Sequence, residues 1–239
     1  MDKKTFWKII EEVNASVDTD DREAILKTTM EKLMDYEPKE INEWKNILDF
    51  YHDLSRREKL WAACAAIGNH YTDDGFEYFR SWLISKGHDV YMNALQDPDT
   101  LAEINIPENS TDFESFWYVA NYAYDRRKVY DKFGAEGVKD EFEQWMTPEG
   151  NKIADYYGRL PHPEYTLEYW LEYKFIQRMS NTYGLDKEFQ LNRPSEDTVE
   201  EIMEEIHLGE DISSDWTVDQ LKEIVPRLYE KYNPVMQMQ

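Results

Sequence analysis

The longest apolar run of the chain is Leu60-Trp61-Ala62-Ala63-Cys64-Ala65-Ala66-Ile67. With eight residues it is too short to span a membrane, which takes about 20 apolar residues in a helix. A helix that is apolar all round is buried on every side by its neighbours. Gly68 and Asn69 follow the run directly, and both residue types commonly end helices. We therefore expect a buried central helix over about residues 58–68.

Amphipathic helices are predicted on both sides of the central run. Phe6, Ile10 and Val13 fall on one face of a first helix. Asp20 is expected to be the N-cap of a second helix, with Glu23 as its capping-box partner. Similar patterns predict further helices over about 20–33, 38–51, 74–86, 89–96, 111–130, 165–181, 195–211 and 217–232. No β-hairpin signal is present. The expected fold class is mainly α, an irregular multi-helix bundle around the central helix.

Three consecutive segments are predicted along the chain. Residues 1–130 would form a helical core domain. Residues 131–194 would be an added helical segment, and Gly134 and Gly137 interrupt the helical pattern near its start. Residues 195–239 would form an acidic helix and a C-terminal helix that pack back on the core.

The charge of the chain restricts its partners. There are 27 Lys and Arg against 50 Asp and Glu among 239 residues, a formal net charge of −23. Nucleic acids and anionic membranes attract basic surfaces, so we expect neither as a partner and instead expect a basic protein. Cys64 has no second cysteine with which to form a disulfide, and the N-terminal residues lead into an amphipathic pattern rather than a signal-peptide core. We therefore expect a cytoplasmic protein.

One polar cluster is the best local candidate for chemistry. It consists of His70, Asp73, Asp74, Glu77, Arg80 and Trp82. Neighbouring carboxylates beside an imidazole can bind a cation or act as an acid and base. A structural interpretation competes: Thr72 or Asp73 caps a helix, acidic residues in its first turn complement the dipole, and Glu77 pairs with Arg80. We favour the structural interpretation.

The other familiar signatures of chemistry are absent from the sequence. The remaining histidines, His52, His88, His162 and His207, lack the spacing of zinc ligands and are each interpreted as lone exposed residues. No glycine-rich phosphate loop or nucleophile elbow occurs, and Cys64 is expected to be too buried to react. We expect no cofactor, no metal and no identifiable catalytic residue.

The segment from Ser195 to Asp211 carries eight carboxylates and no Lys or Arg. Val199, Ile202, Met203 and Ile206 keep helical spacing, which predicts an amphipathic helix with these residues turned inward and an acidic outer face. Acidic ridges are usually only solvated, and a binding surface is the alternative. The candidate partner-binding residues are Glu200, Glu201, Glu204, Glu205, Asp211, Asp215, Trp216 and Tyr229.

The chain resembles a bacterial domain family of unknown function at the motif Thr72-Asp73-Asp74-x-Phe76-x-Tyr78-Phe79-Arg80-x-Trp82-Leu83-Ile84-x-x-Gly87. Shorter pieces agree in order: Phe6-Trp7-x-Ile9-Ile10, Leu60-Trp61-x-Ala63, Asp97-Pro98-Asp99-x-Leu101, Val119-Ala120, Trp216 and Pro226-Arg227-Leu228. The resemblance covers about residues 1–125 and, loosely, the last thirty residues. It implies a bacterial origin and a helical fold, and it brings no activity.

Together these features predict a non-enzymatic interaction protein that presents acidic and aromatic surface to a basic partner. Its most concrete form is an immunity protein that neutralises a basic toxin, such as a secreted nuclease. The alternative is an enzyme, a metal-assisted hydrolase or a peptide-modifying protein, that uses Asp73, Asp74 and Glu77. A purely structural or regulatory helical module is a third possibility.

Overall fold

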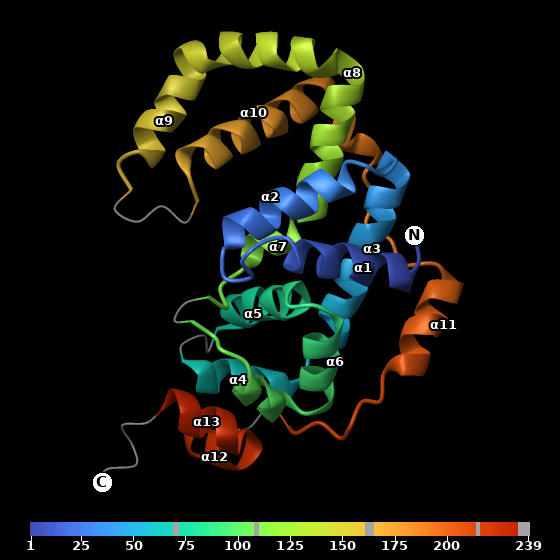
Figure 1. Ribbon diagram of the computed structural model, residues 1–239, viewed down its shortest axis with the longest axis vertical. Coiled ribbons are helices and arrows are strands. Elements are labelled where there is room, and N and C mark those ends of the chain that lie inside the picture. The colour runs from blue at the N-terminus through green and yellow to red at the C-terminus, as the bar shows by residue number, and fades with distance from the viewer. Residues whose placement is uncertain (69–71, 108–109, 161–164, 214–215, 234–239) are drawn as a thin grey trace. The chain divides into compact units, whose positions relative to one another are not determined.

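The computed structural model describes residues 1–68, 72–107, 110–160, 165–213 and 216–233. Within these ranges the chain forms thirteen α-helices and no β-strand, which confirms the mainly α fold class (Figure 1). None of the described helices has both the length and the apolar character needed to cross a membrane.

The chain divides into two compact units, each built from segments that are distant in the sequence. Unit 1 comprises residues 1–22, 46–117 and 193–239, and unit 2 comprises residues 23–45 and 118–192. The units differ from the three consecutive segments expected, because residues 23–45 group with 118–192. They are groups of residues in contact and not segments shown to fold alone, so the predicted domain boundaries stay a prediction.

Unit 1 contains most of the short helices. Its elements are α1 (Lys3–Asn14), α4 (Glu58–Ile67), α5 (Asp73–Ser85), α6 (His88–Gln96), the 3₁₀ helix η1 (Pro98–Glu103), α7 (Glu114–Trp117), α11 (Glu196–Glu205), the 3₁₀ helix η4 (Val218–Gln220), α12 (Leu221–Ile224) and α13 (Pro226–Tyr232). Unit 2 contains α2 (Arg22–Leu33) from its second residue on, α8 (Val119–Trp145), the π-helical turn η2 (Met146–Gly150), α9 (Asn151–Tyr157), α10 (Leu167–Tyr183) and the 3₁₀ helix η3 (Leu185–Glu188). The boundary between the units falls within α3 (Pro38–Leu54).

Helix α4 is the buried central helix that the apolar run predicts. Leu60 and the five residues 62–66 are each at most 3% exposed. Helices α12 and α13 pack against it (Figure 1), and they bring the buried side chains of Leu221 and Leu228. Burial raises the pKa of the Cys64 thiol, which confirms that this cysteine is not poised to react.

Both ends of α4 are capped by residues from the C-terminal segment 206–233. The first N–H groups and the last C=O groups of any helix lack partners within that helix. The Asp211 carboxylate accepts hydrogen bonds from the backbone N–H of Glu58 at 3.1 Å and of Lys59 at 3.2 Å. At the other end, the Asn233 side-chain amide donates to the Ala66 carbonyl at 2.8 Å. The central helix is thus closed by side chains more than 150 residues away.

Asp99 joins two of the short sequence pieces that carry the family resemblance, residues 97–101 and 226–228. The Asp99 carboxylate in η1 accepts from the backbone N–H of Leu228 at 2.9 Å and from Arg227 Nε at 2.9 Å. Asp97 in turn caps η1 by accepting from the Asp99 N–H at 3.1 Å. These bonds fix the start of α13 against η1, so the C-terminal segment is an integral part of unit 1.

In unit 2, α8 bends at Gly134, whose positive φ of 67° only glycine adopts readily. The predicted break is therefore found at Gly134, whereas at Gly137 the helix continues to Trp145. After the bend, α8 runs beside α10 (Figure 1).

The expected capping box between Asp20 and Glu23 is wrong, because the Glu23 carboxylate has other partners. It accepts from the backbone N–H of Thr166 at 2.6 Å and from its hydroxyl at 2.7 Å, and it pairs with Lys27 at 2.7 Å. Burial opposes ionisation of Glu23, but the bonds from Lys27 and Thr166 outweigh it and lower its pKa. Thr166 is itself the N-cap of α10, so Glu23 anchors the start of that helix.

The capping of α4 can be tested with Asp211→Ala. Loss of the carboxylate leaves two helix N–H groups without their acceptor, and we expect the free energy of unfolding to fall by about 1 kcal/mol. Urea unfolding at neutral pH measures this. Glu210→Ala removes an exposed carboxylate next to it and is the matched control. Equal effects of the two substitutions would contradict the capping role.

Candidate functional site

The predicted polar cluster lies at the start of α5. Thr72 is the N-cap, and its hydroxyl accepts from the Gly75 N–H at 3.1 Å. Asp73 and Asp74 follow in the first turn and are exposed, so their charges complement the positive end of the helix dipole. His70 lies outside the described residues. The start of α5 therefore matches the structural interpretation of the motif.

Arg80 is buried, 3% exposed, and closes the end of α3. Its Nη1 donates to the His52 carbonyl at 2.7 Å, its Nη2 lies 3.7 Å from a Glu77 carboxylate oxygen, and its guanidinium lies 5.0 Å from the centre of the Phe76 ring. The His52 carbonyl is among the last of α3, where carbonyls lack partners within the helix. Burial lowers the pKa of Arg80. The cation thus joins α5 to the end of α3.

The rings of Trp82 and His52 are also buried. Trp82 is 1% exposed and packs beside Phe79 with ring centres 5.5 Å apart. His52 is 2% exposed and stacks on Trp117 at 4.4 Å, and Trp117 donates its indole N–H to Asp49 at 2.6 Å. The interpretation of His52 as an exposed residue is therefore wrong. Sequence spacing misses it because its contacts come from α5 and α7, far along the chain.

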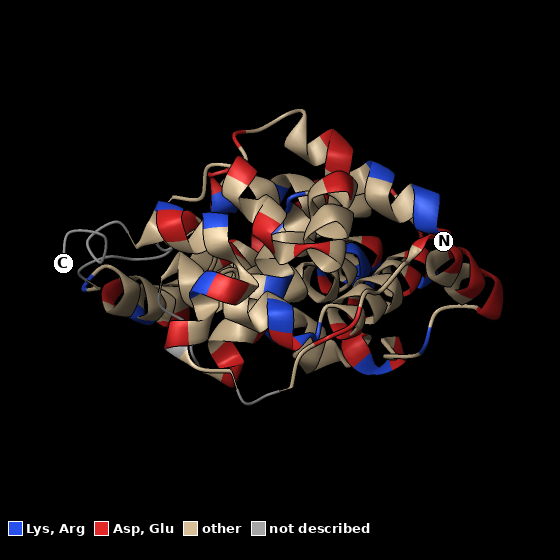
Figure 2. Ribbon diagram, turned by 90° about the horizontal axis from the view of Figure 1, so that it is seen from below, with Lys and Arg blue, Asp and Glu red and all other residues tan. Residues whose placement is uncertain are grey.

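The acidic helix is α11, which ends at Glu205, shorter than the predicted 195–211. Ile202 is fully buried and Glu200, Glu201 and Glu204 are exposed, as the amphipathic pattern predicts. Met203, expected to point inward, is 45% exposed. Figure 2 shows the acidic residues of this helix in red beside the N-terminus. Its outer face carries three neighbouring carboxylates.

Glu205 does not belong to the exposed row. Its carboxylate lies 2.7 Å from Lys3 Nζ and 2.8 Å from His88 Nε2, and Lys3 also donates to the Glu201 carbonyl at 2.9 Å. Burial opposes ionisation of Glu205, but the bonds from Lys3 and His88 outweigh it and lower its pKa. His88 is therefore a partly buried partner in α6 and not the exposed residue that was expected. These contacts hold α11 against α1 and α6.

The remaining candidate partner-binding residues make contacts inside unit 1. Asp211 caps α4, and the Trp216 indole N–H donates to Glu58 at 3.3 Å. Tyr229 is 7% exposed, with Lys222 Nζ 5.4 Å from its ring centre. Asp215 lies outside the described residues. Their role toward a partner stays a prediction.

One of the two forms of the enzyme alternative, the metal-assisted hydrolase, requires a metal site. In the described part of the chain, no group of three His, Cys, Asp or Glu side chains is placed to hold a metal ion.

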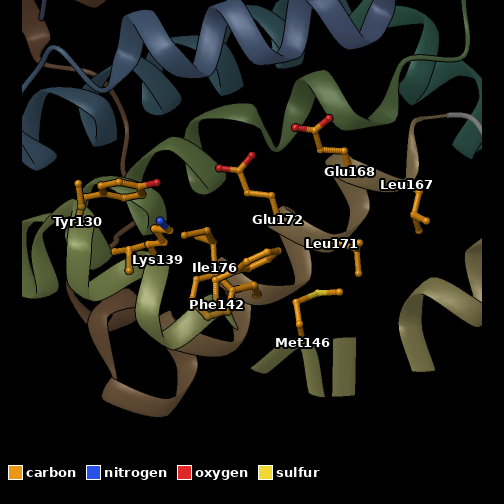
Figure 3. A pocket seen from close by; sticks show the side chains of 12 residues that line it. Tyr130, Lys139, Phe142, Met146, Leu167, Glu168, Leu171, Glu172 and Ile176 are labelled. Carbon is orange, nitrogen blue, oxygen red and sulfur yellow. The ribbon is translucent and has the colours of Figure 1, made fainter. Parts of the chain in front are cut away.

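Unit 2 contains an apolar cavity of about 600 Å³ between the second half of α8 and α10. Phe142, Met146 and Leu171 lie on one side of it, and the carboxylates of Glu168 and Glu172 lie on the other (Figure 3). Glu172 is neutralised by Arg126, whose Nη2 is 3.0 Å away. The sequence does not indicate this cavity, because it exists only after the bend in α8.

A second cavity of unit 2, about 540 Å³, lies between the first half of α8, α10 and η3. Tyr118, Tyr122 and Asp125 reach it from successive turns of α8. Asp125 is partly buried and accepts from the Ser180 hydroxyl at 2.7 Å. Burial raises the pKa of Asp125 to about 6, against a smaller lowering by the Ser180 hydrogen bond. Asp125 is not among the predicted site residues, although the spacing of Tyr118, Tyr122 and Asp125 places them on one helical face.

The roles of the motif residues predict unequal effects of substitution. Arg80→Met removes a buried donor to the end of α3, and we expect the free energy of unfolding to fall by about 1–3 kcal/mol. Replacing Asp73 and Asp74 together with Asn should change it by less than about 1 kcal/mol, because both are exposed and Thr72 remains the cap. Chemical denaturation compares the two variants. A larger loss from the double Asn variant would contradict the structural role of the motif.

Asp125 predicts a pH dependence of stability. Its pKa of about 6 in the folded chain exceeds the ordinary value of 3.8, so the folded state holds this proton more tightly. The resulting stabilisation is complete below about pH 4 and is lost as the pH rises through about 6. Compared with Asp125→Asn, the wild-type free energy of unfolding should fall by about 1–3 kcal/mol between about pH 4 and 7. Parallel pH profiles of wild type and Asp125→Asn would contradict this prediction. Asp140→Asn, at an exposed position of α8, is the control and should follow the wild-type profile.

The comparison with known families supports the expected membership in a domain family of unknown function. A model described as "Protein of unknown function (DUF4240)" matches residues 1–126, more than half of the 239 residues. The matched range contains α1, α4 and the motif at α5. No curated protein and no solved structure matches the chain. The chain therefore belongs to the DUF4240 family, a family of unknown function.

Proposed function

We propose that this chain is a non-enzymatic interaction protein that binds a basic protein partner through α11. The most concrete form of this function is an immunity protein that neutralises a basic toxin. The net charge of −23 supports a basic partner, because complementary fields accelerate encounter and disfavour acidic competitors.

The observation that carries the proposal is the two-sided character of α11. One side is fixed: Ile202 is fully buried, and Glu205 is held by Lys3 and His88. The other side exposes Glu200, Glu201 and Glu204. A helix anchored in this way holds the backbone of its outer row in place, so binding of a partner orders the Glu side chains but not the backbone.

Repulsion within the free helix also favours a partner. Glu200 and Glu204 are one turn apart, and like charges at this spacing destabilise a helix by a few tenths of a kcal/mol. Lys or Arg side chains of a partner would relieve this repulsion. Charges at the edge of an interface act mainly on the rate of association and on its salt dependence.

The test is a variant with Glu200, Glu201 and Glu204 replaced by Gln. The fold should be retained or slightly stabilised, because repulsion is removed. A protein captured from cell extract by the immobilised full-length chain should associate with the variant about three- to tenfold more slowly. Association with wild type should also slow as salt rises, since the Debye length shrinks. Stopped-flow or surface-based kinetics measure both effects.

The matched control removes the same charge from scattered positions. Glu31, Glu136 and Glu230 are exposed helical residues outside α11. Their replacement by Gln should slow association much less than the α11 variant. A captured partner whose association rate ignores the α11 substitutions and the salt would contradict the proposal, and equal slowing by both variants would show that net charge alone acts.

A further inference from the structure

The second cavity of unit 2 has walls suited to a cation. Its lining includes the aromatic rings of Tyr118, Tyr173 and Phe189 and the carboxylates of Asp125 and Asp186. The described residues that line it include no Lys or Arg. Aromatic faces attract cations through the ring quadrupole, and a carboxylate adds a full opposite charge. At about 540 Å³, the cavity can hold a small molecule or a long side chain.

Two buried polar atoms of residues that line this cavity lack hydrogen-bond partners among the described residues. They are the amide oxygen of Asn121 and the hydroxyl of Tyr122, and Tyr122 is only 6% exposed. Buried polar atoms without partners cost free energy, so such atoms commonly mark a place where a ligand or water binds. The Asn121 oxygen can only accept, and it therefore requires a donor.

The carboxylates are placed at different depths. Asp125 is partly buried, and the Ser180 hydroxyl of α10 fixes its orientation by a bond of 2.7 Å. Asp186 in η3 is exposed. An ionised Asp125 is disfavoured by burial, and a bound cation would remove that penalty. The inner carboxylate thus gains most from an occupant with positive charge.

We propose that this cavity binds an organic cation with N–H donors, a primary ammonium or a guanidinium group. Such a group can donate to Asp125 and to the Asn121 oxygen while its alkyl stem packs against the rings. A quaternary ammonium ion would contact the rings but has no N–H for Asn121. The group can belong to a free small amine or to a Lys or Arg side chain of another protein. The inference goes beyond the proposed function, because the cavity lies in unit 2 and α11 lies in unit 1.

Calorimetric titration of the full-length chain with agmatine tests the site, because agmatine carries both cationic groups. Agmatine should bind at about neutral pH, whereas choline and 1-butanol, which lack the N–H cation, should bind at least about tenfold more weakly. Asp125→Asn should weaken agmatine binding about tenfold or more, since one charge-assisted bond corresponds to that factor. Asp140→Asn, the same change at an exposed position outside the cavity, should leave it within about twofold.

Further titrations identify the source of the cation, and a second variant covers the case in which Asp125→Asn does not fold. N-acetyl-arginine amide and N-acetyl-lysine amide carry the same groups as blocked residues. If they bind as well, the site accepts a protein side chain, and if agmatine alone binds, it accepts a free amine. Circular dichroism checks the fold of Asp125→Asn. If that variant does not fold, Asp186→Asn at the exposed rim provides the test, and it should weaken agmatine binding several-fold.

Three results would overturn the proposal: no binding of agmatine to wild type, equal affinity for agmatine and choline, or full affinity in both the Asp125→Asn and Asp186→Asn variants. The variant with Glu200, Glu201 and Glu204 replaced by Gln should bind agmatine like wild type. Failure of this site and failure of the α11 surface are therefore distinguishable.

Discussion

Burial of the middle of α4, Leu60 and residues 62–66, is the constraint on which the rest of unit 1 depends. Burial of this apolar stretch is favoured by the hydrophobic effect, and the terminal N–H and C=O groups of the helix lack partners within it. Asp211 and Asn233 supply them from the C-terminal segment, and Leu221 and Leu228 cover the helix. Side chains from other segments likewise pair with terminal backbone groups where Arg80 donates to the end of α3 and where Asp99 accepts from the start of α13. In unit 1 the ends of α3, α4 and α13 are thus closed by side chains distant in the sequence.

The buried junctions of unit 1 are distinct from the surface and the cavity proposed above as binding sites. Arg80 and Asp99 are buried and join helices, and Trp82 is buried within α5, so these side chains stabilise the fold. The matched range ends at residue 126, whereas the exposed row on α11 lies after it and both cavities of unit 2 draw most of their lining from beyond it. The proposed surface on α11 therefore lies outside the matched range, whereas the proposed cation site combines Asn121 and Asp125 from its last residues with α10 and η3 from beyond it.

The sequence was informative where local physics determines the outcome. Apolar periodicity predicted the helices and the buried Cys64, and composition predicted the acidic face of α11. It could not predict that Glu205 pairs with Lys3 and His88 or that Asp211 caps α4, because a carboxylate in an acidic run looks the same whether it faces solvent or a distant helix end. The cavities were missed for a related reason: the first lies between α10 and the part of α8 after its bend, and the second lies between the first half of α8, α10 and η3, so both depend on segments far apart in the sequence.

Native-state hydrogen exchange of the full-length chain tests the dependence of the core on the C-terminal segment most directly. If α4 is closed by that segment, the slowest amides of α4 and of α13 should exchange with the same opening free energy, because the two helices can open only together. Exchange of α11, which is anchored at its edge, should need less free energy. Slow exchange throughout α4 combined with fast exchange throughout α13 would show that the central helix is buried without its C-terminal caps and would contradict the account.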